Sequence, residues 1–403
     1  MLPKTERKGG QVTRRSIREY ADAVRNRYQK SRKEEKTRIL DEFSKATGLH
    51  RKAAIRLLNR VNKPKVNKKP GRPRKYSSEV VMVLKTCWEA GDRLCSKRLH
   101  PFLPEMVRVL KENGEIKMTS EVEPQIYKMS PATIDRALHP FRQRGGRRSF
   151  STTRPGSLLK SAIPIRTFTE WEENRPGYLE VDTVAHCGES VDGFYLNTLM
   201  AVDVASGWTE GSGVWGKSQE RVGSAIHGIR RRFPFPIQGL DSDNGSEFIN
   251  ERLFNYCRRE RLTFTRSRSY KKNDNCYVEQ KNGNIIRRII GYERYSSRQA
   301  LGILNQIYYL LHLYTNFFQP VMKLVSKSRH GARVFKVYDT AQTPYQRVLK
   351  SGILTETKQV ELAATYSRLN PVTLKKQINQ SLEHLWTLKE PSTIMPSHRI
   401  NQE

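Results

Sequence analysis

Apolar residues in the first part of the chain follow the spacing of short helices. One helical run ends near Tyr28, a second covers about 32–46, and a third extends over 49–60. Thr47-Gly48 separates the second run from the third, and a glycine at this place is typical of a helix end followed by a turn. The order of helix, glycine turn and helix predicts a helix-turn-helix over residues 1–62.

A second group of helices is predicted over residues 77–145. An apolar helix covers Val80 to Trp88, and Ser130-Pro131 supplies the N-cap and the first residue of another helix. Residues 63–76 join the two helical groups and are rich in proline and basic residues. A further linker is expected over residues 146–165.

From residue 178 onward the pattern changes to short strands, first three in succession and then in alternation with helices. The predicted strands are Leu179–Cys187, Tyr195–Val204, Trp208–Trp215, Ile237–Asp241 and Leu262–Arg266, and the predicted helices are Gln219–Arg232, Glu247–Glu260, 277–290 and 298–317. This order predicts a mixed sheet with helices on its faces, as in the ribonuclease-H fold. We therefore expect an α/β core over residues 166–325.

Residues 326–403 are predicted to form a small C-terminal domain. The segment Val334–Tyr338 has the composition of a strand, and Asn370-Pro371 begins a helix. One face of this helix carries an apolar stripe, which consists of Leu374, Ile378, Leu382 and Leu385. Such a stripe is typical either of a core or of an interface with another protein.

The chain is strongly basic, with a formal net charge of +33 over 403 residues. This charge favours nucleic acid as the partner, because Lys and Arg release counterions from phosphates. A membrane-surface protein is the alternative, but the sequence has no lipidation motif and no run approaching the ~20 apolar residues of a membrane span. The N-terminus also lacks the apolar part of a signal peptide. We expect a cytoplasmic, nucleoid-associated protein.

The cysteines indicate reduced thiols. Their number is odd, no two of them form a C-x-x-C pair, and no Cys/His pair has the spacing of a zinc finger. They are Cys87, Cys95, Cys187, Cys257 and Cys276.

More than half of the excess charge lies in the first fifth of the chain. Residues 1–76 contain 25 Lys and Arg against 7 Asp and Glu, a net charge of +18. This favours DNA binding by the first helical segment, with Arg51, Lys52 and Arg56 as candidate contacts. The alternative is a small helical bundle with a solvated basic face. In the second segment, over residues 77–145, the helix that begins at Ser130-Pro131 is a plausible recognition helix, so we expect a second DNA-binding helix-turn-helix there.

The linker after the first helical segment contains a motif that resembles an AT-hook. It reads Pro70-Gly71-Arg72-Pro73-Arg74-Lys75. An extended segment of this kind inserts arginines into a narrow minor groove, so Arg72 and Arg74 are candidate DNA contacts. The alternative is a solvated linker without a binding role.

Three short acidic phrases carry the candidate chemistry. They are Tyr178-Leu-Glu-Val-Asp182-Thr, Asp241-Ser-Asp243-Asn-Gly-Ser-Glu-Phe248 and Asn273-Asp-Asn-Cys-Tyr-Val-Glu279-Gln-Lys-Asn282, with 35 residues between Asp243 and Glu279. Asp182 lies in the first predicted strand, Asp243 follows the fourth, and Glu279 opens a helix. Asp241 competes with Asp243, which we prefer because Asn-Gly follows it. We expect Glu247 to start a helix.

Converging carboxylates of this kind suit the cleavage of a phosphodiester. The phosphate repels nucleophiles and the alkoxide is a poor leaving group. Two divalent metals about 3.5–4 Å apart offset both difficulties. Hard metals of this class prefer carboxylate oxygens.

At these phrases the chain resembles the catalytic core shared by retroviral integrases and bacterial insertion-sequence transposases, over roughly residues 165–330. The resemblance implies that Asp182, Asp243 and Glu279 bind two Mg²⁺ or Mn²⁺ ions. It implies 3′-end cleavage by water, followed by attack of the 3′-OH on target DNA. The chain lacks the His/His/Cys/Cys zinc module of retroviral integrases, so a different domain must bind the DNA ends.

The implied partners are the terminal inverted repeats of a mobile element and a target DNA. Joining two ends to one target requires two active sites at a fixed separation, so we expect a homo-oligomer, a dimer or higher, on DNA. Candidate phosphate contacts near the acids are Lys271, Lys272, Lys281, Arg287 and Arg288, with a solvated basic helix as the alternative. His186 shares a strand face with Asp182 and is more often structural than functional in such a place.

Two other functions stay open. A DNA-binding regulator with an inactive integrase core would have a broken acid set. A ribonuclease H-type nuclease acting on RNA–DNA hybrids needs no tandem helix-turn-helix modules and usually gathers a fourth carboxylate.

Overall fold

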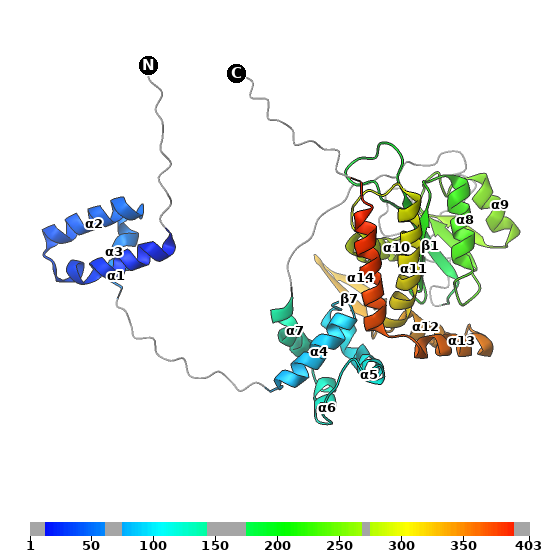
Figure 1. Ribbon diagram of the computed structural model, residues 1–403, viewed down its shortest axis with the longest axis horizontal. Helices are drawn as coiled ribbons and strands as arrows, with labels where there is room; N and C mark the ends of the chain where they lie inside the picture. The colour runs from blue at the N-terminus through cyan, green and yellow to red at the C-terminus, as the bar shows by residue number, and fades with distance from the viewer. Residues whose placement is uncertain (1–12, 61–74, 143–174, 268–274, 391–403) are drawn as a thin grey trace, which may run out of the picture. The chain divides into compact units, whose positions relative to one another are not determined.

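The computed structural model describes residues 13–60, 75–142, 175–267 and 275–390 (Figure 1). The chain divides into two compact units, which consist of residues 1–75 and 76–403. The AT-hook-like motif lies outside the described residues, as does the linker over 146–165.

In the first unit, residues 13–60 form three helices, as the apolar spacing predicts. They are α1 (Arg14–Lys30), α2 (Lys33–Thr47) and α3 (Arg51–Leu58). Gly48 ends α2 with a left-handed backbone (φ 69°), which glycine adopts without a steric penalty. The core is small and consists of Ala21, Tyr28, Ile39, Leu40, Phe43, Ala54 and Leu58. A DNA-binding role for these helices stays a prediction.

The second unit begins with four helices, and the predicted ones are confirmed. They are α4 (Ser78–Ala90), α5 (Ser96–Glu112), α6 (Val122–Tyr127) and α7 (Pro131–Leu138), followed by the short helix η1 (His139–Phe141). The Ser130 side chain caps α7 as expected. These helices share one hydrophobic core with the sheet that follows, and the Tyr314 hydroxyl donates a hydrogen bond to the Ala90 carbonyl.

The central sheet has five strands in the order β3-β2-β1-β4-β5. The strands are β1 (Tyr178–Ala185), β2 (Asn197–Asp203), β3 (Thr209–Val214), β4 (Gly239–Ser242) and β5 (Thr263–Arg266). β2 pairs antiparallel with β1 and β3, whereas β4 runs parallel to β1 and β5. This mixed sheet with helices fits the ribonuclease H-like core that the sequence predicts.

Four helices accompany the sheet. They are α8 (Gln219–Arg230), α9 (Glu251–Arg259), α10 (Cys276–Lys281), which continues as the π-helix η2 (Asn282–Ile290), and α11 (Arg298–Phe318). The prediction that Glu247 starts a helix is wrong: α9 begins at Glu251 after a turn, and the Asn250 side chain caps it. Glu247 therefore lies in the turn before α9, and its side chain faces the sheet.

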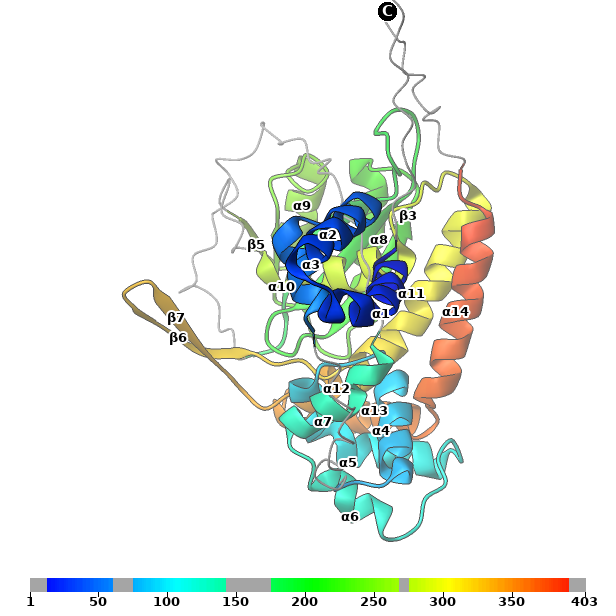
Figure 2. The same cartoon turned by 90° about the vertical axis from the view of Figure 1, so that its left-hand side faces the viewer.

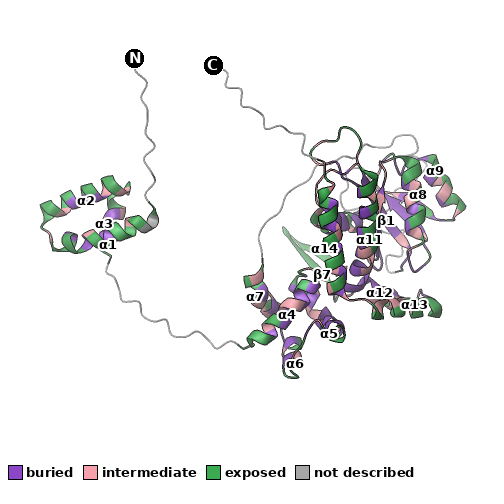
Figure 3. Cartoon of the chain, viewed as in Figure 1, coloured by how far each residue is buried: buried purple, intermediate pink, exposed green. Residues whose placement is uncertain are grey.

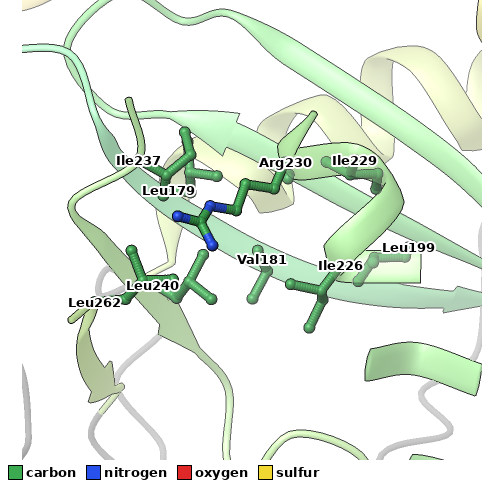
Figure 4. A pocket seen from close by; sticks show the side chains of 10 residues that line it. Leu179, Val181, Leu199, Ile226, Ile229, Arg230, Ile237, Leu240 and Leu262 are labelled. Atoms are coloured by element: carbon green, nitrogen blue, oxygen red, sulfur yellow. The ribbon is translucent and has the colours of Figure 1, made fainter. Parts of the chain in front are cut away.

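Successive residues of β1 face opposite sides of the sheet, and the two sides differ in chemistry. Leu179 and Val181 pack under α8, where Figure 4 shows them with Ile226 and Leu240 around a small apolar cavity. The other side, which carries Glu180 and Asp182, faces α10. The apolar side forms the core of the fold, and the acidic side carries the candidate catalytic residues.

The remaining elements are a hairpin and three helices. They are β6 (Leu324–His330), β7 (Arg333–Tyr338), α12 (Pro344–Lys350), α13 (Glu356–Ser367) and α14 (Pro371–Thr387). In Figure 3 the hairpin and α13 are mainly exposed, whereas α11 and α14 bury one face each. No helix among the described residues has the length and apolar character to cross a membrane.

The apolar stripe of α14 belongs to the core of this chain. Leu374, Ile378, Leu382 and Leu385 are all buried, and α14 packs along α11 (Figures 1 and 2). The suggestion that this stripe contacts another subunit is therefore wrong, because the chain's own helix already covers it.

Candidate active site

Asp182 lies near the middle of β1 on the side of the sheet that faces α10. Its Oδ1 accepts a hydrogen bond from the backbone N–H of Thr183 at 2.7 Å. Its Oδ2 accepts one from the Asn282 side-chain amide, also at 2.7 Å. Both carboxylate oxygens are thereby oriented, and the side chain is half-buried.

Asp243 follows β4 directly and lies beside Asp182 because of the strand register. β1 and β4 are parallel, and Val181 pairs with Ser242, so the next residue along each strand is an acid. Asp243 Oδ1 accepts a hydrogen bond from the Gly245 N–H at 2.9 Å, within the turn that Asn-Gly forms. The adjacent strand ends therefore bring the first two predicted ligands together.

Glu279 lies in the short helix α10, which Glu180 attaches to β1. The Glu180 carboxylate is completely buried and accepts hydrogen bonds from the backbone N–H groups of Tyr277 (2.8 Å) and Val278 (3.0 Å). An anion at this position satisfies free N–H groups and suits the helix dipole. The Asn282 contact with Asp182 holds the other end of α10. Glu279, three residues before Asn282, is exposed on this helix.

Asn275, just before α10, connects the helix to Asp241 in β4 and to Asp243 directly after it. When its side-chain amide nitrogen faces Asp241, it donates to Asp241 Oδ2 at 2.9 Å. Its amide oxygen then accepts from the Asp243 N–H at 3.2 Å. Three sets of contacts therefore hold α10 in place, through Glu180, Asn282 and Asn275.

The carboxylates are close enough to change one another's pKa. The pKa of Asp182 is raised to about 8, first because the protein removes it from water and then because of the negative charge of Asp243. Glu247 and Glu279 contribute in the same direction. The pKa of Asp243 is raised as well, by burial and by Glu247, and Lys217 opposes this rise. The strand register sets Asp182 beside Asp243, and Glu247 and Glu279 are near enough to raise the pKa of Asp182 further.

Glu247 is a fourth acid at the site, buried in the turn before α9. Its Oε1 accepts a hydrogen bond from the Thr183 hydroxyl at 3.0 Å and forms an ion pair with Lys217 at 2.7 Å. A Cβ built at Gly245 would lie 2.6 Å from the Glu247 carboxyl carbon, so any other residue there would require the Glu247 side chain to move. The glycine of the Asp-Asn-Gly phrase therefore lets the backbone approach this carboxylate.

Asp241 occupies a structural position rather than the acidic edge. It is completely buried in β4 and accepts a hydrogen bond from the Thr265 hydroxyl of β5. The charge of Asp243 raises the pKa of Asp182, second only to burial. Asp243 lies next to Asp182 at the acidic edge, and its role as the second metal ligand stays a prediction.

The acids fit hard divalent metals by their chemistry. They offer carboxylate oxygens from three elements, and their mutual repulsion is what a bound cation would offset. Within the described ranges, however, no three His, Cys, Asp and Glu side chains are already gathered in an arrangement that holds an ion. Glu279 is exposed on α10 and is near enough to Asp182 to contribute to its raised pKa. The donor set therefore fits the metal, and its assembly requires side-chain movement.

The predicted DNA contacts differ in their accessibility. Lys52 and Arg56 are exposed on α3, and Arg51 there forms an ion pair with Asp41. Arg72, Arg74, Lys271 and Lys272 lie outside the described residues.

On the helix that carries Glu279, the basic residues are not uniformly solvated. Lys281 is buried, and burial lowers its pKa to about 7. Arg287 donates to the Ala185 carbonyl at 3.2 Å, and Arg288 is exposed and pairs with Asp92. The expectation of a basic helix with solvated side chains is wrong for Lys281, because its side chain is buried. Its role as a DNA contact stays an untested prediction.

His186 has a structural environment. The ring lies 1% exposed next to Tyr295, and its Nε2 forms a 2.7 Å hydrogen bond with the Thr198 hydroxyl. Burial lowers its pKa to about 3, so the ring is neutral at physiological pH. The structural interpretation of this histidine fits its position.

Three residues that help to build the site escaped the sequence analysis. They are Glu180, Asn275 and Asn282, and all three lie inside the acidic phrases that were already singled out. Glu180 carried a usable signal, since it is two residues from Asp182 on the same strand face. The two asparagines flank Glu279 and carried no distinguishing pattern.

Comparison with known proteins gives one relative along most of the chain. No family model matches the sequence. The uncharacterized protein y4rM of Sinorhizobium fredii (strain NBRC 101917 / NGR234) is 43% identical over 334 residues, which cover 82% of this chain and 94% of y4rM.

Among solved structures, the catalytic core domain of BIV integrase is 19% identical, with 43% of this chain and 95% of that chain covered, at a TM-score of 0.28. A simian T-cell lymphotropic virus intasome in complex with PP2A regulatory subunit B56 gamma is 12% identical, with 45% of this chain and 59% of that chain covered, at a TM-score of 0.25. The identity and coverage of the y4rM match are decisive, and this chain belongs to the same protein family as y4rM.

Proposed function

We propose that this protein is a transposase that cleaves and joins DNA through Asp182, Asp243 and Glu279. The observation that carries the proposal is the strand register that sets Asp182 of β1 beside Asp243 after β4, with the helix of Glu279 attached to β1 through Glu180 and Asn282. The reaction is the cleavage of 3′ ends of a mobile element and their transfer into target DNA. The strongly basic chain suits a DNA substrate.

Each residue at the edge has a defined task in this proposal. Two Mg²⁺ ions, which Mn²⁺ can replace, would be held by Asp182, Asp243 and Glu279 and would supply Lewis acidity and an activated water. Asn282 orients Asp182, and Glu180 holds the helix that carries Glu279. Such supporting hydrogen bonds tune metal ligands, and their loss typically costs 10–100-fold in affinity or activity.

The parts outside the core would bind the DNA. The first unit, with exposed Lys52 and Arg56, would hold an element end, and the AT-hook-like motif would add minor-groove contacts. We further propose that the active form is a homo-oligomer on DNA, since two ends must reach one target. The α14 stripe is not its interface.

The proposal is tested with the full-length protein and duplexes taken from the DNA that flanks the gene, in Mg²⁺ or Mn²⁺. We expect Asp182→Asn, Asp243→Asn and Glu279→Gln to leave end binding intact and to reduce strand transfer by at least about 100-fold, which is the upper end of the loss when a residue that only supports a metal ligand is replaced. Glu251→Gln, at an exposed carboxylate on α9, is the matched control.

Two results would contradict the assignment. If Asp243→Asn kept full activity while Asp241→Asn lost it, the second ligand would be Asp241. If the wild-type protein bound DNA but never cut it, the regulator with an inactive core would be favoured.

One observation favours a ribonuclease H-type nuclease as a second candidate. Glu247 is a fourth carboxylate at the same edge, and that class of enzyme usually gathers four. Its ion pair with Lys217 argues for a supporting role, because the pair neutralises its charge. An RNA–DNA hybrid offered beside duplex DNA distinguishes the two, and preferential cleavage of the hybrid's RNA strand would favour the nuclease.

A further inference from the structure

The hairpin formed by β6 and β7 projects from the second unit with both strands exposed along their entire length (Figure 2). Two-stranded ribbons are at best marginally stable alone in water. This one nevertheless shows large apolar residues to solvent, among them Val334 (46% exposed), Phe335 (52%) and Val337 (55%). A projecting ribbon with such side chains requires an explanation.

The base of the hairpin is firmly fixed. Val321 and Gln342 exchange two backbone hydrogen bonds, of 2.8 and 3.1 Å, just before and after the ribbon. Asp339 accepts from the Lys323 N–H at 2.7 Å and forms a 2.8 Å ion pair with Arg347 of α12. The ribbon is therefore held by a body of helices and is not an unattached loop.

The charge of the ribbon has one sign. Residues 324–338 contain four cationic residues and no Asp or Glu, a formal charge of +4. The four are Lys327, Arg329, Arg333 and Lys336. Nothing within the ribbon itself neutralises this charge.

The strand register places three of these cations on one face. Lys327 pairs directly with Lys336, and Arg329 pairs with Val334 on the same side. Like charges directly opposite each other destabilise a sheet. The opposite face carries Phe335 and Val337 paired with serines, together with the fourth cation, Arg333. The arrangement opposes folding of the isolated ribbon and becomes favourable when an anion lies on the cationic face.

We propose that the β6–β7 hairpin is a DNA-binding ribbon whose cationic face, Lys327, Arg329 and Lys336, contacts the phosphate backbone of the duplex. The choice of duplex DNA rests on the proposed function. A seven-residue strand extends about 23 Å, and the major groove admits a two-stranded ribbon. A second copy of this chain is the less suitable occupant, since its net charge of +33 repels the ribbon.

The first test measures the salt dependence of duplex binding by the full-length protein. Replacing Lys327 and Lys336 with Ala removes two phosphate contacts, so the slope of log K against log salt should decrease in size by about 2. Affinity at 0.15 M salt should then fall roughly 30-fold. The matched control replaces Lys376 and Lys389, which are exposed on and after α14, and loses the same charge. Equal losses in the two double variants would overturn the proposal.

The second test identifies the partner directly. The photo-crosslinking analogue p-benzoylphenylalanine is placed at position 334, on the cationic face, and at position 309 of α11 as a control that is also exposed (46% and 59%). We expect a crosslink to labelled duplex from position 334 and none from position 309. A crosslink from 334 to a second copy of the chain, or no crosslink while the wild-type protein binds duplex, would overturn the proposal.

The two proposals fail in distinguishable ways. If the wild-type protein bound no duplex, both the proposed function and the role of the hairpin would be refuted. A protein that cuts and joins DNA but does not crosslink from position 334 removes only the role of the hairpin.

Discussion

Replacing Glu180 with glutamine tests how the acidic site is assembled. The Glu180 carboxylate is completely buried and accepts hydrogen bonds from the backbone N–H groups of Tyr277 at 2.8 Å and Val278 at 3.0 Å. Glutamine has nearly the same size and keeps one acceptor oxygen. It loses the negative charge at the N-terminus of α10 and adds an amide group that must find a partner.

The expected magnitude follows from these two hydrogen bonds. A bond to a charged group contributes about 1.5–3 kcal/mol, against about 1 kcal/mol for a neutral one. Allowing for partial compensation, we expect the attachment of α10 to weaken by about 1–3 kcal/mol, which corresponds to roughly 5–150-fold. Glu279 and Asn282 would leave their places together, because both lie on the released segment.

Hydrogen exchange of the backbone amides over residues 277–282 measures this attachment directly. We expect these amides to lose protection by the same roughly 5–150-fold in Glu180→Gln, since local opening sets their exchange. Strand transfer should fall with it, while DNA binding is retained. Glu251→Gln removes a carboxylate from the first turn of the exposed helix α9 and should change neither quantity.

Two outcomes would refute this reasoning. Unchanged exchange and unchanged activity would show that Glu180 does not hold α10. Unchanged exchange with lost activity would show that Glu180 acts on the reaction itself rather than through the position of Glu279.

Three further predictions concern other parts of the molecule. Because the pKa of Asp182 is raised to about 8, a metal that binds below that pH must displace a proton, and the apparent Mg²⁺ affinity should rise by up to about tenfold per pH unit between pH 6 and 8. Calorimetry in two buffers would show the released proton, and an affinity that does not depend on pH would contradict this prediction. Leu385→Ala should lower the free energy of unfolding, measured in denaturant, by about 2–5 kcal/mol without changing the oligomeric state, because Leu385 is fully buried within the chain. A change in oligomeric state alone would show that the α14 stripe is a subunit interface after all. Replacing Arg72 and Arg74 with Ala should weaken binding most on A·T-rich duplexes in a titration, and equal losses on G·C-rich duplexes would reduce the segment to a charged tether.

Much of the secondary structure was determined by the sequence alone, because it depends on neighbours a few residues away. The periodicity of apolar residues and the caps at Ser130 and Asn370 predict helices that the structure contains. The alternation of strands and helices after residue 178 predicts the five-stranded mixed sheet. The spacing of the acidic phrases likewise selected the carboxylates that the fold brings to one edge.

Only the tertiary structure decided which side chains support the acids and which surfaces are free. The register between β1 and β4, set by pairing across some 60 residues, places Asp243 rather than Asp241 at the edge with Asp182. Burial of Lys281 and of the α14 stripe depends on the elements that pack over them, which local periodicity does not reveal. The role of Glu180 is likewise not visible in the sequence. It accepts hydrogen bonds from two N–H groups that are almost 100 residues away in the chain and become its neighbours only when α10 packs on β1.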